Sequence, residues 1–326
     1  MRCLYSLLLL GVTICVLIPP SVRAATHNRL EGVSLAGLEM PQGTFPPTAQ
    51  EADYYAAAGM NILRLPFMWE RLQPTLYGPL DKTYLGHILS FVKAANAAGV
   101  NVLIDCHNYA MYNGWQLGSP RLPAKALADM WQKLATATKD MNVSFDIMNE
   151  PYHQNGQQWR AVLDVVIPAI RATGATNTIF VEGVWWANAA LWPERTGPYF
   201  TGINDNNYIF EAHQYFDSDG SGTHTDCTNG AAAIAKIQPF VTWLRQNKAH
   251  GFLGEFGLTA DPGCTQTLAT VLQYLQDNGD VIDGWAYWAA GPAWGNYMFS
   301  IEPHFNKTPA QEAVQMQTLK RFLPHG

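Results

Sequence analysis

The sequence predicts a single-domain α/β protein whose eight parallel strands close into a (β/α)8 barrel, the TIM-barrel fold. Apolar, β-rich runs alternate with amphipathic segments over roughly 300 residues, and no linker marks a second module. The runs are nearly continuously apolar, which is typical of a parallel sheet buried on both faces. An open doubly wound sheet is the alternative. It would usually show a glycine-rich first turn, which Gly32–Gly37 matches poorly.

Eight runs are predicted to be the strands: Gly32–Leu35, Asn61–Pro66, Val100–His107, Val143–Glu150, Thr178–Gly183, Tyr208–Tyr215, Phe252–Phe256 and Ile282–Trp288. The amphipathic segments predicted to be helices are Ala49–Ala58, Tyr84–Ala98, Ala124–Lys139, Gln158–Ala172, Ala231–Asn247, Thr265–Asn278 and Pro309–Phe322. The fifth unit is the exception, because residues 185–207 are aromatic and show no clear helix.

Residues 1–24 have the pattern of a secretory signal peptide. A positively charged start precedes the apolar segment Leu4–Ile18, and Val22–Ala24 forms a cleavage site with small residues. A membrane anchor is the alternative, but the apolar run is short and Pro19–Pro20 interrupts it. We therefore expect a secreted protein, extracellular or periplasmic, that consists of residues 25–326 and has no membrane attachment.

Composition limits the class of partner. Hydrophobic residues make up 48% of the 326 residues and charged residues 14%, which is enough for a large core. The formal net charge is −6; without Arg2 and Arg23, 18 basic residues remain against 26 acidic ones, a net charge of −8. This balance argues against a nucleic acid as partner. The 11 Trp residues supply flat rings of the kind that stack on sugars. We also expect the protein to be a monomer.

Three of the five cysteines remain after removal of the signal segment. Cys227 and Cys264 both lie in polar, Gly-rich loops and are expected to form a disulfide in an oxidising compartment. Cys106 lies within an apolar run and is expected to be a buried free thiol. Neither Cys-x-x-Cys nor His-Glu-x-x-His occurs, so zinc chemistry has little support.

Polar residues occupy the carboxyl ends of most predicted strands, where a closed barrel carries its catalytic groups. A random set of strand ends would be dominated by Gly, Ser and Asp turn formers. Here the ends carry groups able to contact a substrate: Arg64, His107, Asn108, Asn149, Glu150, His213, Tyr215, Glu255 and Trp288.

Glu150 and Glu255 are the central pair in this set. Pro151 has no N–H to donate and cannot continue a central strand, so Glu150 should lie at a strand end. Glu255 lies between Leu253 and Phe256, a setting unlike that of a solvated surface charge. Two carboxyl groups from strands four and seven would face each other across the barrel mouth. That arrangement suits cleavage of a glycosidic bond.

The two carboxyl groups need opposite protonation states in this chemistry. One gives a proton to the leaving oxygen, and the other attacks the anomeric carbon as a carboxylate. Arg64 close to Glu255 would favour the ionised form there, whereas Glu150, partly desolvated and near a second negative charge, would hold its proton. Glu150 is therefore predicted as the acid/base and Glu255 as the nucleophile. A buried Glu255 that only pairs with Arg64 is the structural alternative.

Taken together and in order, the motifs resemble glycoside hydrolase family 5, whose barrel carries two glutamates on strands four and seven. The matching elements are Leu63-Arg64-Leu65-Pro66, Asp105-Cys106-His107-Asn108-Tyr109, Asn149-Glu150-Pro151, His213-Gln214-Tyr215, Gly254-Glu255-Phe256-Gly257 and Trp288. Residues 211–224 resemble the endoglucanase branch of that family, shared by secreted fungal and bacterial cellulases. The resemblance implies a glycoside hydrolase domain over residues 25–326. It would be a retaining endo-β-1,4-glucanase that acts on β-glucan polysaccharide without a cofactor.

The resemblance also implies roles for the neighbours of the two glutamates: Arg64 and Tyr215 hold the nucleophile, His107 and Asn149 contact the sugar at the cleavage point, His213 helps set the acid/base, and Trp288 stacks under that sugar. Asn108, beside His107, is a further candidate for support. Cys106 departs from the family pattern, where a valine-like residue is more usual, and we expect only a change of packing.

Several aromatic residues and one acidic loop remain open. Trp185 or Trp186, in the loop after the fifth strand, is expected to line the cleft. The other candidates, which core or rim packing would equally explain, are Trp69, Tyr109, Trp115, Trp192 and Trp294. Asp217 and Asp219 in a Gly-rich loop hint at calcium. A loop shaped by turn formers and pinned by Cys227 is the simpler interpretation, and we expect no metal.

Two other functions fit the same sequence. A mannanase or mixed-linkage β-glucanase on the same barrel is the alternative enzyme, because the choice depends on contacts to the sugar 2-hydroxyl. An inactive, secreted carbohydrate-binding barrel is the alternative of another class; loss of one glutamate would be its signature, and both are present. A serine esterase has no support, since no Gly-x-Ser-x-Gly occurs.

Overall fold

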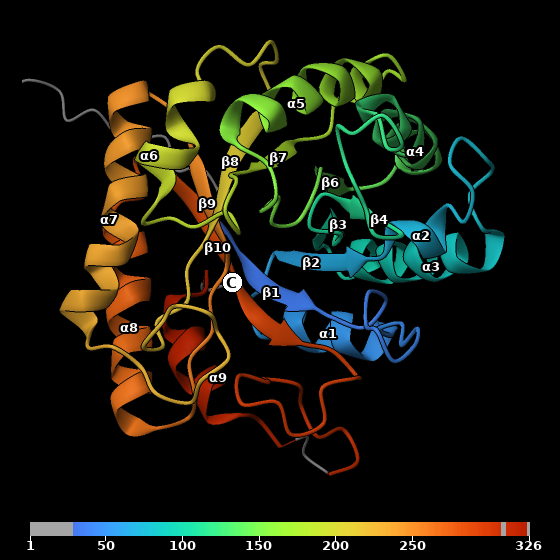
Figure 1. Cartoon of the computed structure of the whole chain (residues 1–326). Helices are drawn as coiled ribbons and strands as arrows, with labels where there is room; N and C mark the ends of the chain where they lie inside the picture. The colour runs from blue at the N-terminus through green and yellow to red at the C-terminus, as the bar shows by residue number, and fades with distance from the viewer. Residues whose placement is uncertain (1–28, 308–310, 325–326) are drawn as a thin grey trace, which may run out of the picture.

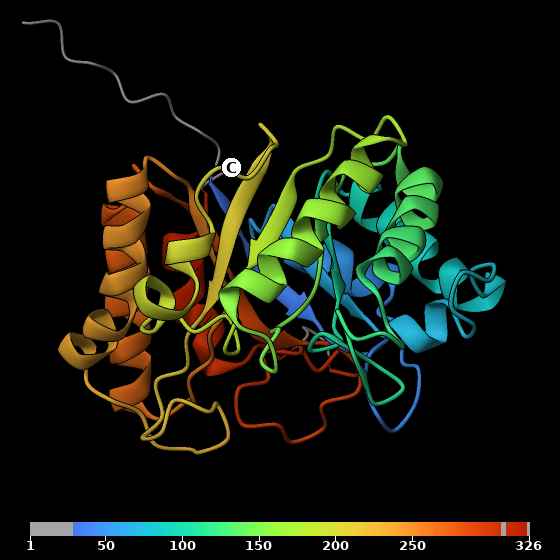
Figure 2. The same ribbon diagram turned by 45° about the horizontal axis from the view of Figure 1, so that its top comes forward.

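The structure is a computed structural model that describes residues 29–307 and 311–324 of the chain. Eight parallel strands form one closed barrel in the order β1-β10-β9-β8-β7-β6-β3-β2, and helices surround it (Figures 1 and 2). The predicted (β/α)8 barrel is confirmed, and closure of the sheet excludes the open doubly wound alternative. The predicted signal peptide, residues 1–24, lies outside the described residues.

The barrel strands are β1 Leu30–Leu35, β2 Ile62–Phe67, β3 Asn101–Cys106, β6 Val143–Asp146, β7 Ile179–Glu182, β8 Tyr208–His213, β9 Gly251–Glu255 and β10 Ile282–Ala290. The helices are α1 Ala49–Ala57, α2 Trp69–Leu72, α3 Lys82–Ala97, α4 Ala124–Thr138, α5 Gly156–Arg171, α6 Trp192–Arg195, α7 Gly230–Asn247, α8 Pro262–Asp277 and α9 Val314–Leu319, with 3-10 turns η1 at Gly197–Tyr199 and η2 at Lys320–Phe322. A small hairpin, β4 Met111–Tyr112 and β5 Trp115–Gln116, follows β3.

Some predicted elements differ from the observed ones. The fourth strand was expected to run to Glu150, but β6 ends at Asp146, and Glu150 has a φ of 47°, a left-handed conformation that does not continue a strand. The fifth unit contains only α6 and η1, in line with the missing helical pattern. The closing helix is shorter than predicted: within the described part it is limited to α9 and η2.

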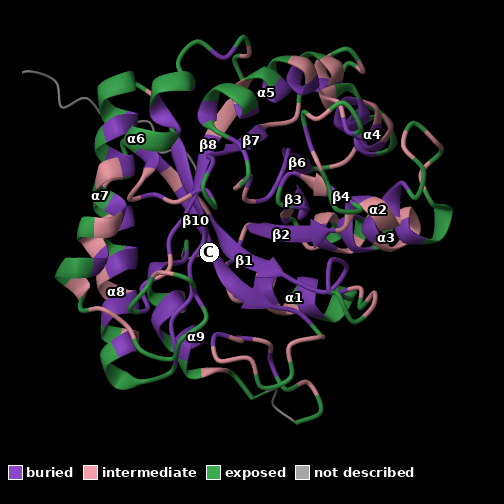
Figure 3. Cartoon of the chain, viewed as in Figure 1, coloured by how far each residue is buried: buried purple, intermediate pink, exposed green. Residues whose placement is uncertain are grey.

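Amphipathic helices cover the outside of the barrel, with their buried faces on the strands and their exposed faces outward (Figure 3). Two buried indoles also tie these helices to the strand ends. Trp131 of α4 donates from Nε1 to the Ile147 carbonyl at 3.0 Å, and Trp159 of α5 donates to the Glu182 carbonyl at 2.8 Å. The packing of the outer layer therefore positions the backbone that carries the polar strand ends.

The inside of the barrel is divided into an apolar part and a polar part. One buried apolar cluster consists of Ile62, Leu103, Phe180, Phe252 and Ala286. Since successive side chains alternate between the two faces of a strand, residues two positions further along point inward as well. Those positions carry Arg64, Asp105, Glu182, Gly254 and Trp288. In β2, β3 and β7 the change from apolar to charged side chains thus occurs within a single strand, toward its carboxyl end.

Covalent and chain-level features complete the fold. The predicted disulfide is confirmed: Cys227, in the loop after β8, is bonded to Cys264 of α8, with Cα atoms 5.7 Å apart. Cys106 is a buried free thiol, as expected. Among the residues that the structure describes, no helix has both the length and the apolar character needed to cross a membrane.

Candidate active site

A cleft at the carboxyl ends of the barrel strands gathers most of the candidate residues. Its volume is about 650 Å³. The predicted site residues that line it are His107, Glu150, Trp185, Trp186, His213, Tyr215, Glu255 and Trp288. Arg64 and Asn149 are fully buried and contact each other, Arg64 Nη2 donating to Asn149 Oδ1 at 2.8 Å.

Glu255 ends β9 and accepts hydrogen bonds on both oxygens. Arg64 Nη1 donates to Oε1 at 2.7 Å, and the Tyr215 hydroxyl donates to Oε2 at 2.8 Å. Burial raises the pKa of Glu255, while Arg64 and the Tyr215 hydrogen bond oppose that rise. Both partners favour the carboxylate, which is the form that a nucleophile requires.

Glu150 has a different environment. Its N–H donates to Glu182 Oε2 at 2.7 Å, and its Oε1 lies 2.8 Å from His213 Nδ1. Burial and the charge of Glu255 raise the pKa of Glu150 well above its ordinary value. Burial and the Arg64 charge lower the pKa of His213 well below its ordinary value, so the ring is neutral. Glu150 therefore retains its proton where an exposed glutamate would have lost it.

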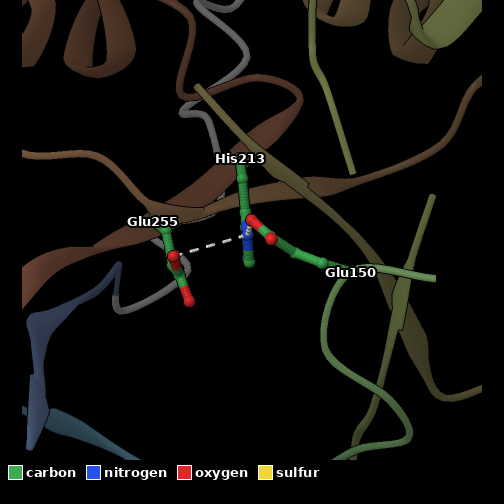
Figure 4. A group of neighbouring side chains, drawn as sticks. All are labelled: Glu150, His213 and Glu255. Carbon is green, nitrogen blue, oxygen red and sulfur yellow. Dashed lines mark hydrogen bonds and ion pairs between the residues drawn. The ribbon is translucent and has the colours of Figure 1, made fainter. Parts of the chain in front are cut away.

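The two glutamates are close enough to act on one bond. One carboxylate oxygen of each and one ring nitrogen of His213 all lie within 4.8 Å of one another (Figure 4). His213 lies between them, with Nδ1 3.7 Å from Glu255 Oε2. A pair of carboxyl groups with opposite protonation preferences at this spacing can serve as acid and nucleophile.

Arg64 is surrounded by carboxyl groups to which the sequence analysis gave no role. Its Nη2 lies 3.0 Å from Asp105, 3.0 Å from Asp146 and 3.1 Å from Glu182, and its Nε lies 3.5 Å from Glu211. Burial raises the pKa of Asp105 to about 6 and that of Asp146 to about 7. One guanidinium is therefore shared by four further buried carboxyl groups, and burial raises the pKa values of Asp105 and Asp146 toward neutrality.

A sequence signal for this cluster does exist. Each acid interrupts an apolar strand, and acids are almost never fully buried without a partner. With Arg64 at an inward position of β2, the inward acids of β3, β6, β7 and β8 can reach it across the barrel interior.

The two asparagines of the predicted set have different surroundings. Asn149 Nδ2 is buried and has no hydrogen-bond partner among the described residues, so it remains an available donor. Asn108 does not line the cleft: its Oδ1 accepts from the Trp69 N–H at 2.7 Å, and its Nδ2 donates to Glu70 Oε2 at 2.5 Å. Its side chain joins the loop after β3 to α2.

His107 and Trp288 form one wall of the cleft. Their rings are stacked, with centroids 5.3 Å apart and planes 10° apart. His107 Nδ1 lies 2.8 Å from Asp105 Oδ2, and Nε2 lies 3.2 Å from the Tyr109 hydroxyl. Burial lowers the pKa of His107. Tyr109, which the sequence left between core and rim, also lines the cleft.

Trp185 and Trp186 form another wall. Both have left-handed backbone conformations, with φ of 57° and 55°, and they are 38% and 46% exposed. The ring of Tyr152 stacks on Trp186 with centroids 4.7 Å apart, and the Arg195 guanidinium lies 4.8 Å from the Trp185 ring. Of the other aromatics, Trp69 and Trp192 belong to the core.

The acidic loop after β8 is organised by its own backbone. Asp217 is buried and accepts from the N–H groups of Gly222 and Thr223, each at 3.0 Å, and from Ser221 Oγ at 3.1 Å. Asp217, Asp219 and His224 are close enough to hold an ion. The hydrogen bonds already satisfy the Asp217 carboxylate, as in a loop shaped by turn formers.

Comparisons with known proteins agree with this geometry. The sequence pattern of the cellulase family, glycosyl hydrolase family 5, matches residues 25–291. Endo-beta-1,4-glucanase B of Aspergillus niger is 38% identical over 256 residues, covering 75% of this chain and 74% of that protein. An endo-beta-1,4-glucanase structure from Xanthomonas axonopodis pv. citri has a TM-score of 0.86 and 38% identity, covering 91% of this chain and 100% of that one.

A structure of XacCel5A in complex with cellopentaose is similar to the same degree, with a TM-score of 0.86 and 39% identity over 90% of this chain and 99% of that one. The family pattern runs from before β1 to the residue after β10. It therefore includes Glu150, Glu255 and the residues that contact them. The chain belongs to the cellulase family, glycosyl hydrolase family 5.

Proposed function

We propose that the protein is a secreted, retaining endo-β-1,4-glucanase that hydrolyses internal bonds of β-glucan chains by double displacement. The observation that carries this proposal is the approach of one Glu150 oxygen and one Glu255 oxygen to within 4.8 Å. Retaining enzymes place their carboxyl groups about 5–5.5 Å apart, whereas inverting enzymes need room for a water molecule and separate them by roughly 6.5–9.5 Å.

The reaction begins with Glu255 as a carboxylate and Glu150 as an acid. Glu255 attacks the anomeric carbon while Glu150 gives its proton to the departing glycosidic oxygen, which leaves a glycosyl ester on Glu255. Glu150, now ionised, takes a proton from water as the water attacks the same carbon and releases Glu255. Arg64 and Tyr215 hold Glu255 through both steps, and neutral His213 contacts Glu150.

Several groups are available to bind the sugar at the cleavage point. Trp288 offers an apolar wall, His107 lies beside it, and Asn149 Nδ2 is an unused buried donor. Trp185 and Trp186 can stack on further sugar units along the chain. The related XacCel5A structure in complex with cellopentaose supports a linear glucan as the substrate class. The disulfide is in keeping with secretion, because such bonds persist in oxidising compartments.

An activity panel tests the proposal. We expect the protein without residues 1–24 to release reducing sugar from carboxymethylcellulose faster than from galactomannan, with mixed-linkage glucan as the intermediate case. Preference for galactomannan would replace the glucanase by a mannanase, and binding without release would indicate an inactive carbohydrate-binding barrel. Proton NMR of the first product should show the β anomer; the α anomer would indicate inversion.

Two variants assign the roles in the same assays. Glu255→Gln should abolish turnover with little change in thermal unfolding, and retained activity would remove it as nucleophile. Glu150→Gln should damage hydrolysis of natural glucans far more than that of an activated aryl glycoside, whose leaving group needs little protonation. Equal damage to both substrates would contradict the acid role of Glu150.

A further inference from the structure

Two buried glutamates lie beneath the acid/base and take no direct part in the proposed reaction. Glu182 of β7 and Glu211 of β8 are paired in register on neighbouring parallel strands, and both are fully buried. Their carboxyl groups and the His213 ring offer atoms that all lie within 4.8 Å of one another. His213 in turn contacts Glu150, so this pair lies one residue away from the group that supplies the proton.

Burial and the charges of Asp146 and Glu211 raise the pKa of Glu182 well above its ordinary value, but its hydrogen bonds favour the carboxylate form more than the surroundings of Glu211 do. Its Oε2 accepts from the Glu150 N–H at 2.7 Å, and its Oε1 accepts from Arg64 Nη2 at 3.1 Å. Both oxygens therefore act as acceptors, as those of a carboxylate do. Through the first of these bonds Glu182 also holds the left-handed backbone of Glu150 in place.

Glu211 has the opposite surroundings. Both of its carboxyl oxygens are buried and have no hydrogen-bond partner among the described residues. His213 Nε2 is also buried and has no hydrogen-bond partner in the described part of the chain; it lies 3.6 Å from Glu211 Oε1 and 3.4 Å from Glu182 Oε1. Buried polar atoms without partners are rare and costly. A hydrogen bond between Glu211 and His213 would satisfy both atoms if Oε1 and Nε2 approached each other by roughly 0.6–0.9 Å.

The position of Glu211 depends on a glycine in the next strand. A Cβ atom at Gly254 of β9 would lie 1.7 Å from Glu211 Oε1. Any other residue at 254 would therefore displace the carboxyl group that faces His213. Gly254, the residue immediately before Glu255 in β9, thus leaves the space that the Glu211 carboxyl group occupies.

Charge around the pair favours a proton on Glu211. Asp146 of β6, Asp105 of β3 and Glu255 of β9 act on Glu211 through their charges, Arg64 of β2 opposes them, and Glu182 of β7 lies beside it. Burial and the charges of these acids raise the pKa of Glu211 well above its ordinary value. Arg64 is already shared among several carboxyl groups, with its Nε donating to Asp146. Burial and the nearby acids therefore favour the protonated form of Glu211.

A metal ion is the other way to satisfy these atoms, but the site already contains a cation. Arg64 contacts both glutamates: Nη2 lies 3.1 Å from Glu182 Oε1, and Nε lies 3.5 Å from Glu211 Oε1. A divalent ion would be repelled by this guanidinium at close range in a buried environment. A proton on Glu211 needs no ion-sized cavity. It neutralises the carboxylate and does not place a further cation beside Arg64.

We propose that protonated Glu211, held beside ionised Glu182, is a positioning residue that fixes the His213 tautomer. Its hydroxyl donates to His213 Nε2, so the neutral ring carries its own proton on Nδ1 and donates it to Glu150 Oε1. That bond occupies Glu150 Oε1 as an acceptor, and Oε2 then holds the acid proton for the glycosidic oxygen. No covalent bond changes, and Glu211 keeps its proton through the cycle. The inference rests on the proposed acid role of Glu150.

Nitrogen-15 NMR of the protein labelled at histidine tests this inference directly, because the two neutral tautomers give different ring nitrogen shifts. The His213 signals are assigned as those lost in His213→Gln. We expect His213 to be neutral with its proton on Nδ1. A proton on Nε2 would overturn the proposal, since the carboxyl pair would then be the acceptor. The readout needs no turnover, so it is separate from the test of the proposed function by Glu255→Gln.

Two variants of Glu211 provide the kinetic test. Glu211→Gln keeps a donor for Nε2 and should keep the Nδ1 proton and the leaving-group dependence of the normal enzyme. Glu211→Met removes the donor; we expect mixed tautomers and a loss of about tenfold to a hundredfold on cello-oligosaccharides, with a much smaller loss on an activated aryl cellobioside. Equal losses on both substrates would show a merely structural role and overturn the proposal.

A matched control is Glu51→Gln, a buried carboxyl at the start of α1. It should change neither the His213 signals nor the ratio of the two activities. Thermal unfolding reports whether each variant is folded. If Glu211→Met does not fold, the tautomer of the normal protein and the Glu211→Gln kinetics still decide the question.

Discussion

Removal of the Tyr215 hydroxyl should move the acid limb of the pH–activity profile toward higher pH. The hydroxyl donates to Glu255 Oε2 at 2.8 Å, and this hydrogen bond lowers the pKa of Glu255 against the effect of burial. Tyr215→Phe removes the donor and leaves the ring, which stacks on Phe299 with centroids 6.2 Å apart. The change is therefore confined to one oxygen atom at the nucleophile.

The size of the shift follows from the strength of the lost bond. A hydrogen bond to a charged group contributes about 1.5–3 kcal/mol, and that contribution is made to the carboxylate rather than to the neutral acid. One pKa unit corresponds to about 1.4 kcal/mol, so the pKa of Glu255 should rise by about 1–2 units. The nucleophile is active only when ionised. Activity should therefore be lost at acidic pH over a correspondingly higher range, while the alkaline limb, which reports Glu150, should move less.

The measurement is kcat/KM for a soluble cello-oligosaccharide as a function of pH, because this ratio reports the ionisation of the free enzyme. The apparent values belong to the coupled pair of glutamates, so the comparison is made between variants and not with single-residue pKa values. Tyr274→Phe, on α8 away from the cleft, is the matched control. An acid limb that stays in place, or moves to lower pH, would refute the argument that Tyr215 stabilises an ionised Glu255.

Three further changes test the surroundings of the site. Asn108→Ala should lower thermal stability by about 1–3 kcal/mol through the lost bonds to Trp69 and Glu70, with KM nearly unchanged; a raised KM at full stability would place Asn108 at the substrate. The double variant Cys227→Ser, Cys264→Ser removes a disulfide with a sequence separation of 37 and should lower the free energy of unfolding by up to about 4 kcal/mol. An unfolding temperature equal to that of the unaltered, oxidised protein would contradict this. Trp186→Ala should raise KM for long cello-oligosaccharides by up to about tenfold and affect a short aryl glycoside less; equal effects on both would remove Trp186 as a distal stacking residue.

The architecture could be predicted because its signals are local. Each strand of this barrel is buried on both faces and appears as a short apolar run, and each helix has its own periodicity and end signals. The place of Glu255 at a strand end follows from the same pattern. Glu150, in contrast, lies beyond the end of β6 and has a left-handed conformation. Its N–H donates to Glu182 of another strand, a contact that no local sequence pattern contains.

Side-chain direction was harder to predict than strand position. His107 and Asn108 are consecutive, and consecutive side chains of an extended segment point to opposite sides, so both could not face the cleft. In the structure His107 lines the cleft, whereas Asn108 binds the Trp69 N–H. The sequence places both at the end of one strand but does not say which of them points inward.

The buried acids escaped prediction for a related reason. Asp105, Asp146, Glu182 and Glu211 each lie within or at the end of an apolar run, where the hydrophobic pattern dominates the assignment. Their common feature appears only when the sheet closes and brings them around Arg64. Recognising such a cluster from sequence requires the inward register of several strands at once, which depends on non-local pairing.

The opposite protonation that we propose for the two glutamates depends on where one cation is placed. Both carboxyl groups are buried, and burial alone would raise both pKa values. Arg64 Nη1 donates to Glu255 Oε1 at 2.7 Å, whereas the side chain of Glu150 contacts the neutral ring of His213. The charge of Arg64 also keeps His213 neutral. The guanidinium opposes the pKa rise of both glutamates, but it contacts only Glu255 directly, and Glu150 has a neutral ring as its partner; the pKa of Glu150 is therefore raised more strongly, which favours Glu150 as the proton donor.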